Sequence, residues 1–201
     1  MYSQNDEEKV ILDFLKTDRG RFLDIGACDG IYVSNTRKLL EIGWGGVLVE
    51  PRAESFHKLF DNCAPFFDRV SLIQAAVSNA EGLKRFWIDM HPNREWSATV
   101  NKALLGIGSV IEPSPLPVYI PCITTDELCQ FGPFDFISID AEWEDFAILK
   151  SSPKRFWIGC KLLCVESRHQ LERIEMKAYL KSIGFTRIIH ETKENLLVTP
   201  L

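Results

Sequence analysis

Short apolar runs alternate with segments of helical periodicity along most of the chain. Residues 5–16 carry apolar side chains at spacings of three and four behind an acidic first turn, which predicts an N-terminal helix over about residues 5–17. Uninterrupted apolar runs bounded by glycine, proline or polar residues predict buried strands. The predicted strands cover residues 21–27, 46–50, 70–77, 118–123, 134–140, 162–166, 185–190 and 195–199, and the later helices cover residues 34–42, 54–60, 143–149 and 171–183.

This alternation sets the fold class. Strands separated by helices connect through right-handed crossovers, which produce a largely parallel sheet covered by helices on both faces. The last two predicted strands are close in sequence and are expected to form an antiparallel hairpin at one edge. A length of 201 residues allows one sizeable core, so we predict a single α/β domain over residues 1–201.

The alternation breaks down between about residues 84 and 117. Proline, glycine and small hydroxyl residues are frequent there, a composition typical of loops. A long irregular segment within a compact domain is commonly a lid or binding loop. Trp96 and Ser97 are its candidate substrate contacts, because aromatic rings stack on ligand faces and small hydroxyls fix orientation. In the alternative interpretation, Trp87 and Trp96 fill the core beneath the loop.

Composition disfavours several classes of protein. A formal net charge of −5 gives no overall attraction to phosphate backbones, so nucleic acid is not an expected partner. No apolar stretch reaches the ~18 residues of a membrane span, and the polar, acidic start is unlike a signal peptide. The six cysteines form no Cys-x-x-Cys pair. We therefore expect a cytoplasmic protein with reduced, buried cysteines and no membrane partner.

Acidic residues end several of the predicted strands. In an open α/β sheet, ligands bind in the crevice beyond the carboxyl ends of the strands. Asp24, Glu50, Asp140 and Glu166 lie at or near such ends. Burying a carboxylate costs free energy unless it is paired or hydrogen-bonded. The distribution therefore predicts a ligand site at this edge of the sheet.

The segment 24–30, with the sequence DIGACDG, gives the strongest local signal. Gly26 and Gly30 allow a sharp turn and a close approach of a ligand to the backbone. A dinucleotide fold normally shows G-x-G-x-x-G, whereas Ala27 and the acidic Asp29 stand in this segment. Negative charge repels a pyrophosphate and suits a cationic ligand, so the turn favours a cationic cofactor over a nicotinamide one.

Glu50 ends the next predicted strand. An acidic side chain in this place accepts hydrogen bonds from both ribose hydroxyls of an adenosine. Taken alone, Glu50 is equally well interpreted as a strand-end residue that faces water. The Gly-rich turn one strand earlier favours the ribose role.

Several motifs together resemble the FkbM family of class I S-adenosylmethionine-dependent methyltransferases. They are FLDIGACDG at residues 22–30, SNT at 34–36, GW at 43–44, VEP at 49–51, AAVS at 75–78, ITTDEL at 123–128 and IDAEWE at 139–144, with SQ at 3–4 before an acidic pair. The resemblance covers nearly the whole chain except residues 86–117. The chain departs from the family pattern at Ser138, where lysine is usual, and at Trp143, where glycine is usual.

The resemblance implies a Rossmann-like class I methyltransferase fold, with a seven-stranded, mostly parallel sheet whose last strand is antiparallel. It implies S-adenosylmethionine as the methyl donor, with the methionine moiety near Asp24 and Gly26 and the ribose on Glu50. It places the adenine beside Ala76 and Val77. The other residues that we assign to the cofactor are Ala27, Asp29, Gly30, Asn35, Pro51 and Asp140.

The resemblance further implies methylation of a hydroxyl on a small, sugar-containing acceptor. Methyl transfer is an in-line displacement at an activated carbon, so the protein mainly positions the acceptor and removes its proton. Asp140 is the candidate base, with Glu142 second, His169 as a possible assistant and Glu166 toward the substrate. In alternative readings Asp140 is a helix N-cap and His169 a surface residue.

Other interpretations remain open at this level. Asp140, Glu142, Glu166 and His169 have the chemistry of magnesium or manganese ligands, although no tight ligand spacing supports a metal. The same cofactor site also serves transfer to nitrogen or to another small metabolite. The departures at Ser138 and Trp143 keep a non-catalytic cofactor-binding or interaction domain in consideration, and nothing in the sequence specifies an oligomeric state.

Overall fold

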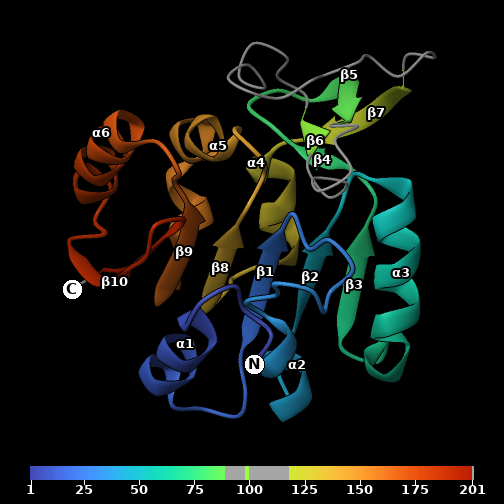
Figure 1. Ribbon diagram of the computed structural model, residues 1–201, viewed down its shortest axis with the longest axis horizontal. Coiled ribbons are helices and arrows are strands. Elements are labelled where there is room, and N and C mark those ends of the chain that lie inside the picture. The colour runs from blue at the N-terminus through green and yellow to red at the C-terminus, as the bar shows by residue number, and fades with distance from the viewer. Residues whose placement is uncertain (89–97, 100–117, 201) are drawn as a thin grey trace.

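The computed structural model describes residues 1–88, 98–99 and 118–200, and its centre is a seven-stranded sheet (Figure 1). The strand order is β10-β11-β9-β8-β1-β2-β3. The strands are β1 (Arg21–Ile25), β2 (Gly45–Val49), β3 (Val70–Ile73), β8 (Phe136–Ile139), β9 (Leu162–Glu166), β10 (Arg187–Glu191) and β11 (Asn195–Thr199). β11 runs in the opposite direction to the rest of this sheet and pairs antiparallel with β9 and β10. The predicted seven-stranded α/β sheet with an antiparallel last strand is confirmed.

Helices cover both faces of this sheet. The α-helices are α1 (Glu7–Leu15), α2 (Arg37–Ile42), α3 (Ala53–Cys63), α4 (Thr125–Leu128), α5 (Asp145–Ser151) and α6 (Gln170–Ser182). Their ends follow local chemistry: Gly43, with φ +118°, ends α2, and Thr124 with Glu127 forms a capping box that starts α4. None of the helices within the described ranges is long and apolar enough to span a membrane.

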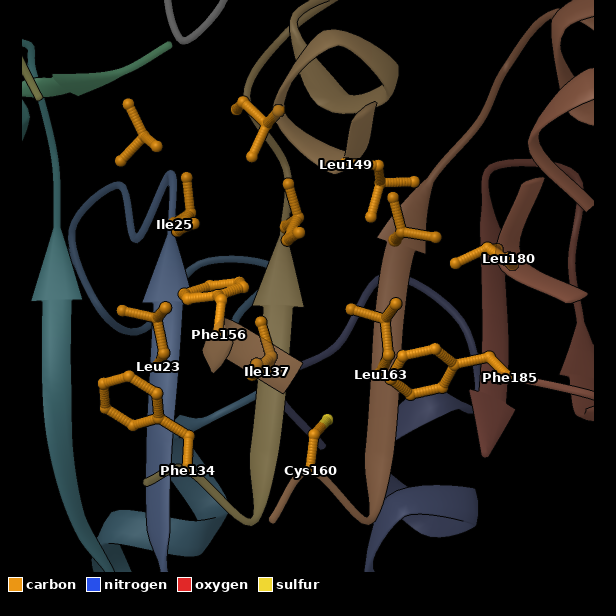
Figure 2. Close-up of a cluster of buried hydrophobic side chains, with 14 of the residues drawn as sticks. Leu23, Ile25, Phe134, Ile137, Leu149, Phe156, Cys160, Leu163, Leu180 and Phe185 are labelled. Atoms are coloured by element: carbon orange, nitrogen blue, oxygen red, sulfur yellow. The ribbon is translucent and has the colours of Figure 1, made fainter. Parts of the chain in front are cut away.

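The strands divide their side chains between two cores. Leu23, Ile137 and Leu163 point to one face, where they pack with residues of α4, α5 and α6 (Figure 2). Phe22 and Phe136 point to the other face, where they pack with residues of α1, α2 and α3. Successive residues of a strand face opposite sides of a sheet, so two apolar faces require the continuous apolar runs seen in the sequence.

Two predicted strands take different places in the structure. The run 70–77 is divided: β3 joins the main sheet, whereas β4 (Ala76–Val77) pairs in parallel with β7 (Val118–Ile123). A second sheet has the order β4-β7-β5-β6, with β5 (Gly82–Ile88) and β6 (Ala98–Thr99). An apolar pattern reports burial and does not specify the pairing partner, so it did not reveal this second sheet.

The second sheet lies beyond the carboxyl ends of the parallel strands, toward which β1, β2, β3, β8 and β9 all point (Figure 1). This edge carries the residues that the sequence singled out for ligand binding.

Candidate cofactor and acceptor site

The Gly-rich turn follows β1 directly. The backbone N–H groups of Gly26 and Ala27 donate to the carbonyl oxygen of Val49, at 2.9 and 3.1 Å, and so hold the turn against β2. Gly26 has φ +84°, and a Cβ placed there would lie 1.7 Å from the backbone oxygen of Asp140. The close passage of these two backbones therefore requires glycine.

The second half of the turn is built in the same way. Gly30 has φ +73°, and a Cβ there would lie 2.6 Å from Cδ1 of Leu59 in α3. One carboxylate oxygen of Asp29 accepts the N–H groups of Ile31 and Tyr32, at 2.9 and 2.7 Å. Asp29 thus stabilises the turn itself while it adds negative charge to the loop.

Glu50 lies at the end of β2 and connects two loops. One carboxylate oxygen accepts the N–H of Cys28 at 2.9 Å, and the other accepts the N–H of Arg52 at 2.8 Å. The residue is only 7% exposed, so the interpretation of Glu50 as a water-facing strand end is wrong. Burial raises the pKa of Glu50 to about 7. Each carboxylate oxygen of Glu50 therefore accepts one backbone N–H and can accept a further hydrogen bond.

Asp24 belongs to a polar row that crosses three strands. Asp24 of β1, Ser138 of β8 and Cys164 of β9 are consecutive neighbours in register. Thr36 donates its hydroxyl to Asp24 at 2.5 Å, and the amide of Asn35 donates to Ser138 at 3.3 Å. Burial raises the pKa of Asp24 to about 6. The loop before α2 thus covers this polar row with side chains that can hydrogen-bond.

Asp140 lies at the end of β8, where its backbone N–H donates to Ile25 at 2.9 Å. Burial raises the pKa of its carboxyl to about 7, and the negative charge of Glu142 adds to this effect. The N-cap of α5 is Glu144, so the reading of Asp140 as a helix N-cap is wrong. The side chain of Asp145 instead accepts the N–H of Ala141, at 2.8 Å.

Arg168 and Asp145 complete the acidic end of the site, and the sequence argument missed both. Nη2 of Arg168 lies 2.5 Å from Oε1 of Glu166, and Nη1 lies 3.2 Å from Oε2 of Glu142. Burial raises the pKa of Asp145 and Glu166 well above their usual range. The sequence did hold a signal for Arg168, because this cation lies between Glu166 and His169, which are both predicted site residues.

A stacked aromatic pair joins the same two loops. The rings of Trp143 and His169 lie 4.4 Å apart with an interplanar angle of 27°. Trp143 has φ +79° and Glu142 has φ +45°, a backbone region that residues other than glycine rarely adopt.

Among residues 1–88, 98–99 and 118–200, no group of three or more His, Cys, Asp or Glu side chains is arranged to hold a metal ion.

The two residues predicted to lie beside the adenine form β4. Ala76 and Val77 are buried. Ser78 follows them and donates its hydroxyl to Glu144 at 3.1 Å, while Lys84 donates to the Ser78 hydroxyl at 2.7 Å. These contacts fasten the second sheet to the start of α5.

The structure therefore collects most of the predicted residues at one edge of the main sheet. Gly26 passes Asp140, and the charge of Asp140 raises the pKa of Glu50, which places these two carboxylates near one another. Arg168 joins Glu142 to Glu166. Pro51 is half-buried after Glu50. The predicted substrate contacts Trp96 and Ser97 lie outside the described residues.

Comparison with known proteins agrees with this fold. A domain model described as the methyltransferase FkbM domain matches residues 24–187. The chain thus has the class I methyltransferase fold, and it belongs to the methyltransferase FkbM domain family, as its motifs predicted. Membership of this family implies S-adenosylmethionine as the methyl donor. A search of functionally curated proteins gave no significant match.

Solved structures share the fold at low sequence identity. Methyltransferase FkbM from Methylobacillus flagellatus KT has a TM-score of 0.61 at 14% identity; the match covers 90% of this chain and 44% of that protein, so this chain spans less than half its length. Precorrin 8w decarboxylase from Methanobacterium thermoautotrophicum has a TM-score of 0.55 at 11% identity, covering 98% of this chain and 90% of that one. Precorrin-6y C5,15-methyltransferase from Geobacter metallireducens GS-15 also gives 0.55 at 11%, covering 100% and 89%.

Proposed function

We propose that this protein binds S-adenosylmethionine across the turn 24–30 and the end of β2. The observation that carries the proposal is Glu50, a buried carboxylate at the tip of the strand next to a glycine turn. Burying a carboxylate costs free energy, and hydrogen bonds from two ribose hydroxyls would offset that cost. Gly26 supports the proposal, because glycine there lets the turn pass directly against the backbone of Asp140, the residue that follows β8.

The remaining cofactor contacts follow from the same edge. Asp24 and Asn35 are our candidates for the methionine end, since they form the polar row on β1 and the loop before α2. Ala76 and Val77 are our candidates for the adenine, since they are buried apolar residues at the start of the second sheet. Ala27, Asp29, Gly30 and Pro51 contribute mainly backbone shape and charge.

The reaction that we propose is methyl transfer to a hydroxyl of a small, sugar-containing acceptor. S-adenosylmethionine, when bound, supplies a methyl group already activated by its sulfonium sulfur. The protein then has to place the acceptor oxygen in line and to take its proton. Asp140 is the proposed base: with a pKa of about 7 its carboxylate accepts a proton readily near neutral pH. Glu142, Glu166 and His169 are our candidates for orienting the acceptor hydroxyls.

The proposal is tested in two stages. Calorimetric titration should show saturable binding of S-adenosylmethionine and of S-adenosylhomocysteine; saturation by NAD and by neither of these would contradict the cofactor assignment. Methyl-labelled donor should then transfer label to members of a panel of neutral sugars and sugar-bearing metabolites. Transfer to amines alone would replace the oxygen acceptor, and binding with no transfer to any acceptor would favour a non-catalytic domain.

The role of Asp140 has its own comparison. Asp140→Asn should abolish transfer and leave binding of S-adenosylhomocysteine within a few-fold of the wild type. Asp126→Asn is the matched control, because Asp126 is an exposed carboxylate that pairs with Arg155. Full turnover in Asp140→Asn would remove the assignment of the base.

A further inference from the structure

Arg168 links the loop after β9 to the loop after β8. Its guanidinium contacts Glu166 at 2.5 Å and Glu142 at 3.2 Å. Glu166 is buried and Glu142 is about one-fifth exposed, so one branch of the guanidinium lies against the buried part of the site. Planar guanidinium groups are suited to holding two carboxylates in a fixed geometry.

The charges that bear on Asp140 come from every element packed around it. They are Asp24 on β1, Glu50 on β2, Glu142 on its own loop, Asp145 at the start of α5, and Glu166 and Arg168 at the end of β9. Arg168 is the positive charge in this set. Carboxylates this close compete for few protons, because each ionised group raises the proton affinity of the others.

A base needs a free carboxylate. If one of these groups keeps a proton at neutral pH and that group is Asp140, the acceptor's proton has no place to go. A cation that pairs with the flanking carboxylates lowers the proton affinity of the whole cluster. It also holds Glu142 and Glu166 in fixed positions beside Asp140.

We propose that Arg168 is the positioning residue of this site: by holding Glu142 and Glu166, it compensates the negative charge around Asp140 and leaves more of that carboxylate free to take the acceptor's proton. This inference rests on the proposed role of Asp140. The stack of Trp143 on His169 joins the same two loops.

The test measures the titration of Asp140 in protein to which no acceptor has been added. Protein labelled with ¹³C in its aspartate carboxyl groups is titrated by NMR between pH 4 and 9, and Asp140→Asn identifies the Asp140 resonance. In Arg168→Met and Arg168→Gln the titration midpoint of Asp140 should rise by about one pH unit or more. Arg168→Lys, which keeps the charge and loses the fork, should show a smaller rise.

Arg155→Met is the matched control, since Arg155 forms a two-point pair with Asp126 on the exposed surface. It should leave the midpoint of Asp140 unchanged. If Arg168 only links the two loops, Arg168→Gln should be less stable than the wild type while the titration midpoint of Asp140 stays unchanged. That result would overturn the proposal. Circular dichroism confirms which variants are folded. If neither neutral variant folds, the Asp140 midpoint in Arg168→Lys decides the question: a rise supports the proposal, and an unchanged midpoint contradicts it.

Binding of S-adenosylhomocysteine separates this inference from the proposed function. Wild type that does not bind it contradicts the methyltransferase proposal, while the titration still reports on Arg168. Wild type that binds it, together with an Asp140 midpoint that does not respond to Arg168→Gln, contradicts the role of Arg168 alone.

Discussion

Gly26 and Asp140 meet so closely that a Cβ on Gly26 would lie 1.7 Å from the backbone oxygen of Asp140. The contact joins the turn proposed for the cofactor to the residue proposed as base. These residues directly follow β1 and β8, two neighbouring strands that are far apart in sequence. Backbone packing therefore sets the distance between the proposed cofactor turn and the proposed base, and a change at Gly26 should disturb it directly.

Gly26→Ala should destabilise the protein by about 2–5 kcal/mol. A side chain at φ +84° costs about 1–2 kcal/mol, and the clash with a backbone oxygen adds an overpacking cost. Urea denaturation measures the loss. Gly184→Ala is the control, because Gly184 has φ +105° with nothing within 4 Å of its added Cβ, and it should lose only the conformational part. Equal losses in the two variants would show that Asp140 does not restrict the turn.

Glu50→Gln should weaken binding of S-adenosylmethionine and S-adenosylhomocysteine by about 10-fold to 100-fold. The amide keeps one acceptor oxygen, but its NH₂ group faces a backbone N–H of Cys28 or Arg52. Hydrogen bonds to a charged acceptor are worth about 1.5–3 kcal/mol, and about 1.4 kcal/mol is a factor of ten in affinity.

Glu54→Gln controls for the loss of a nearby charge. Glu54 pairs with Arg52, and its side chain is 77% exposed. The Glu54→Gln variant should bind S-adenosylmethionine and S-adenosylhomocysteine with the affinity of the wild type in the same calorimetric titration. Unchanged affinity in Glu50→Gln would remove the ribose assignment.

The cofactor-free protein should lose stability as the pH rises from 5.5 to 8. Burial raises the pKa of Asp24 from 3.8 to about 6, of Asp140 from 3.8 to about 7 and of Glu50 from 4.5 to about 7. The folded protein therefore holds more protons than the unfolded chain between about pH 4 and 7, so unfolding releases protons and becomes easier with rising pH.

Urea denaturation at pH 5.5 and pH 8 tests this sign. Each unit of pKa difference is worth about 1.4 kcal/mol per group. Asp140→Asn removes one titrating carboxyl and should show a smaller fall in the free energy of unfolding. A free energy of unfolding that increases from pH 5.5 to 8 contradicts the prediction.

Trp143→Gly should be more stable than Trp143→Ala. Alanine normally stabilises relative to glycine, but at φ +79° glycine avoids a cost of about 1–2 kcal/mol. Thermal or urea unfolding of the two variants gives the order. In the control, Lys150→Ala within α5 should be more stable than Lys150→Gly, which is the usual order in a helix. His169→Ala should cost about 0.5–1.5 kcal/mol through the lost stack.

The sequence by itself determined the class of fold and much of the site. Apolar runs and helical periodicity are local properties, so they predicted the main sheet, its antiparallel hairpin and most helices to within a few residues. The turn at Gly26 was predictable for a similar reason, since a left-handed backbone selects glycine wherever it occurs. The end of β2 likewise identified Glu50 as a site candidate before any contact was known.

Tertiary structure alone decided how these pieces combine. The division of residues 70–77 between two sheets depends on which strands are available as hydrogen-bond partners, and β7 comes from a distant part of the chain. The pairing of Arg168 with Glu142 and Glu166 depends on the order of β8 and β9 in the sheet. Burial gives Asp24, Glu50 and Asp140 their raised pKa values, and burial is produced only when segments far apart in sequence pack together.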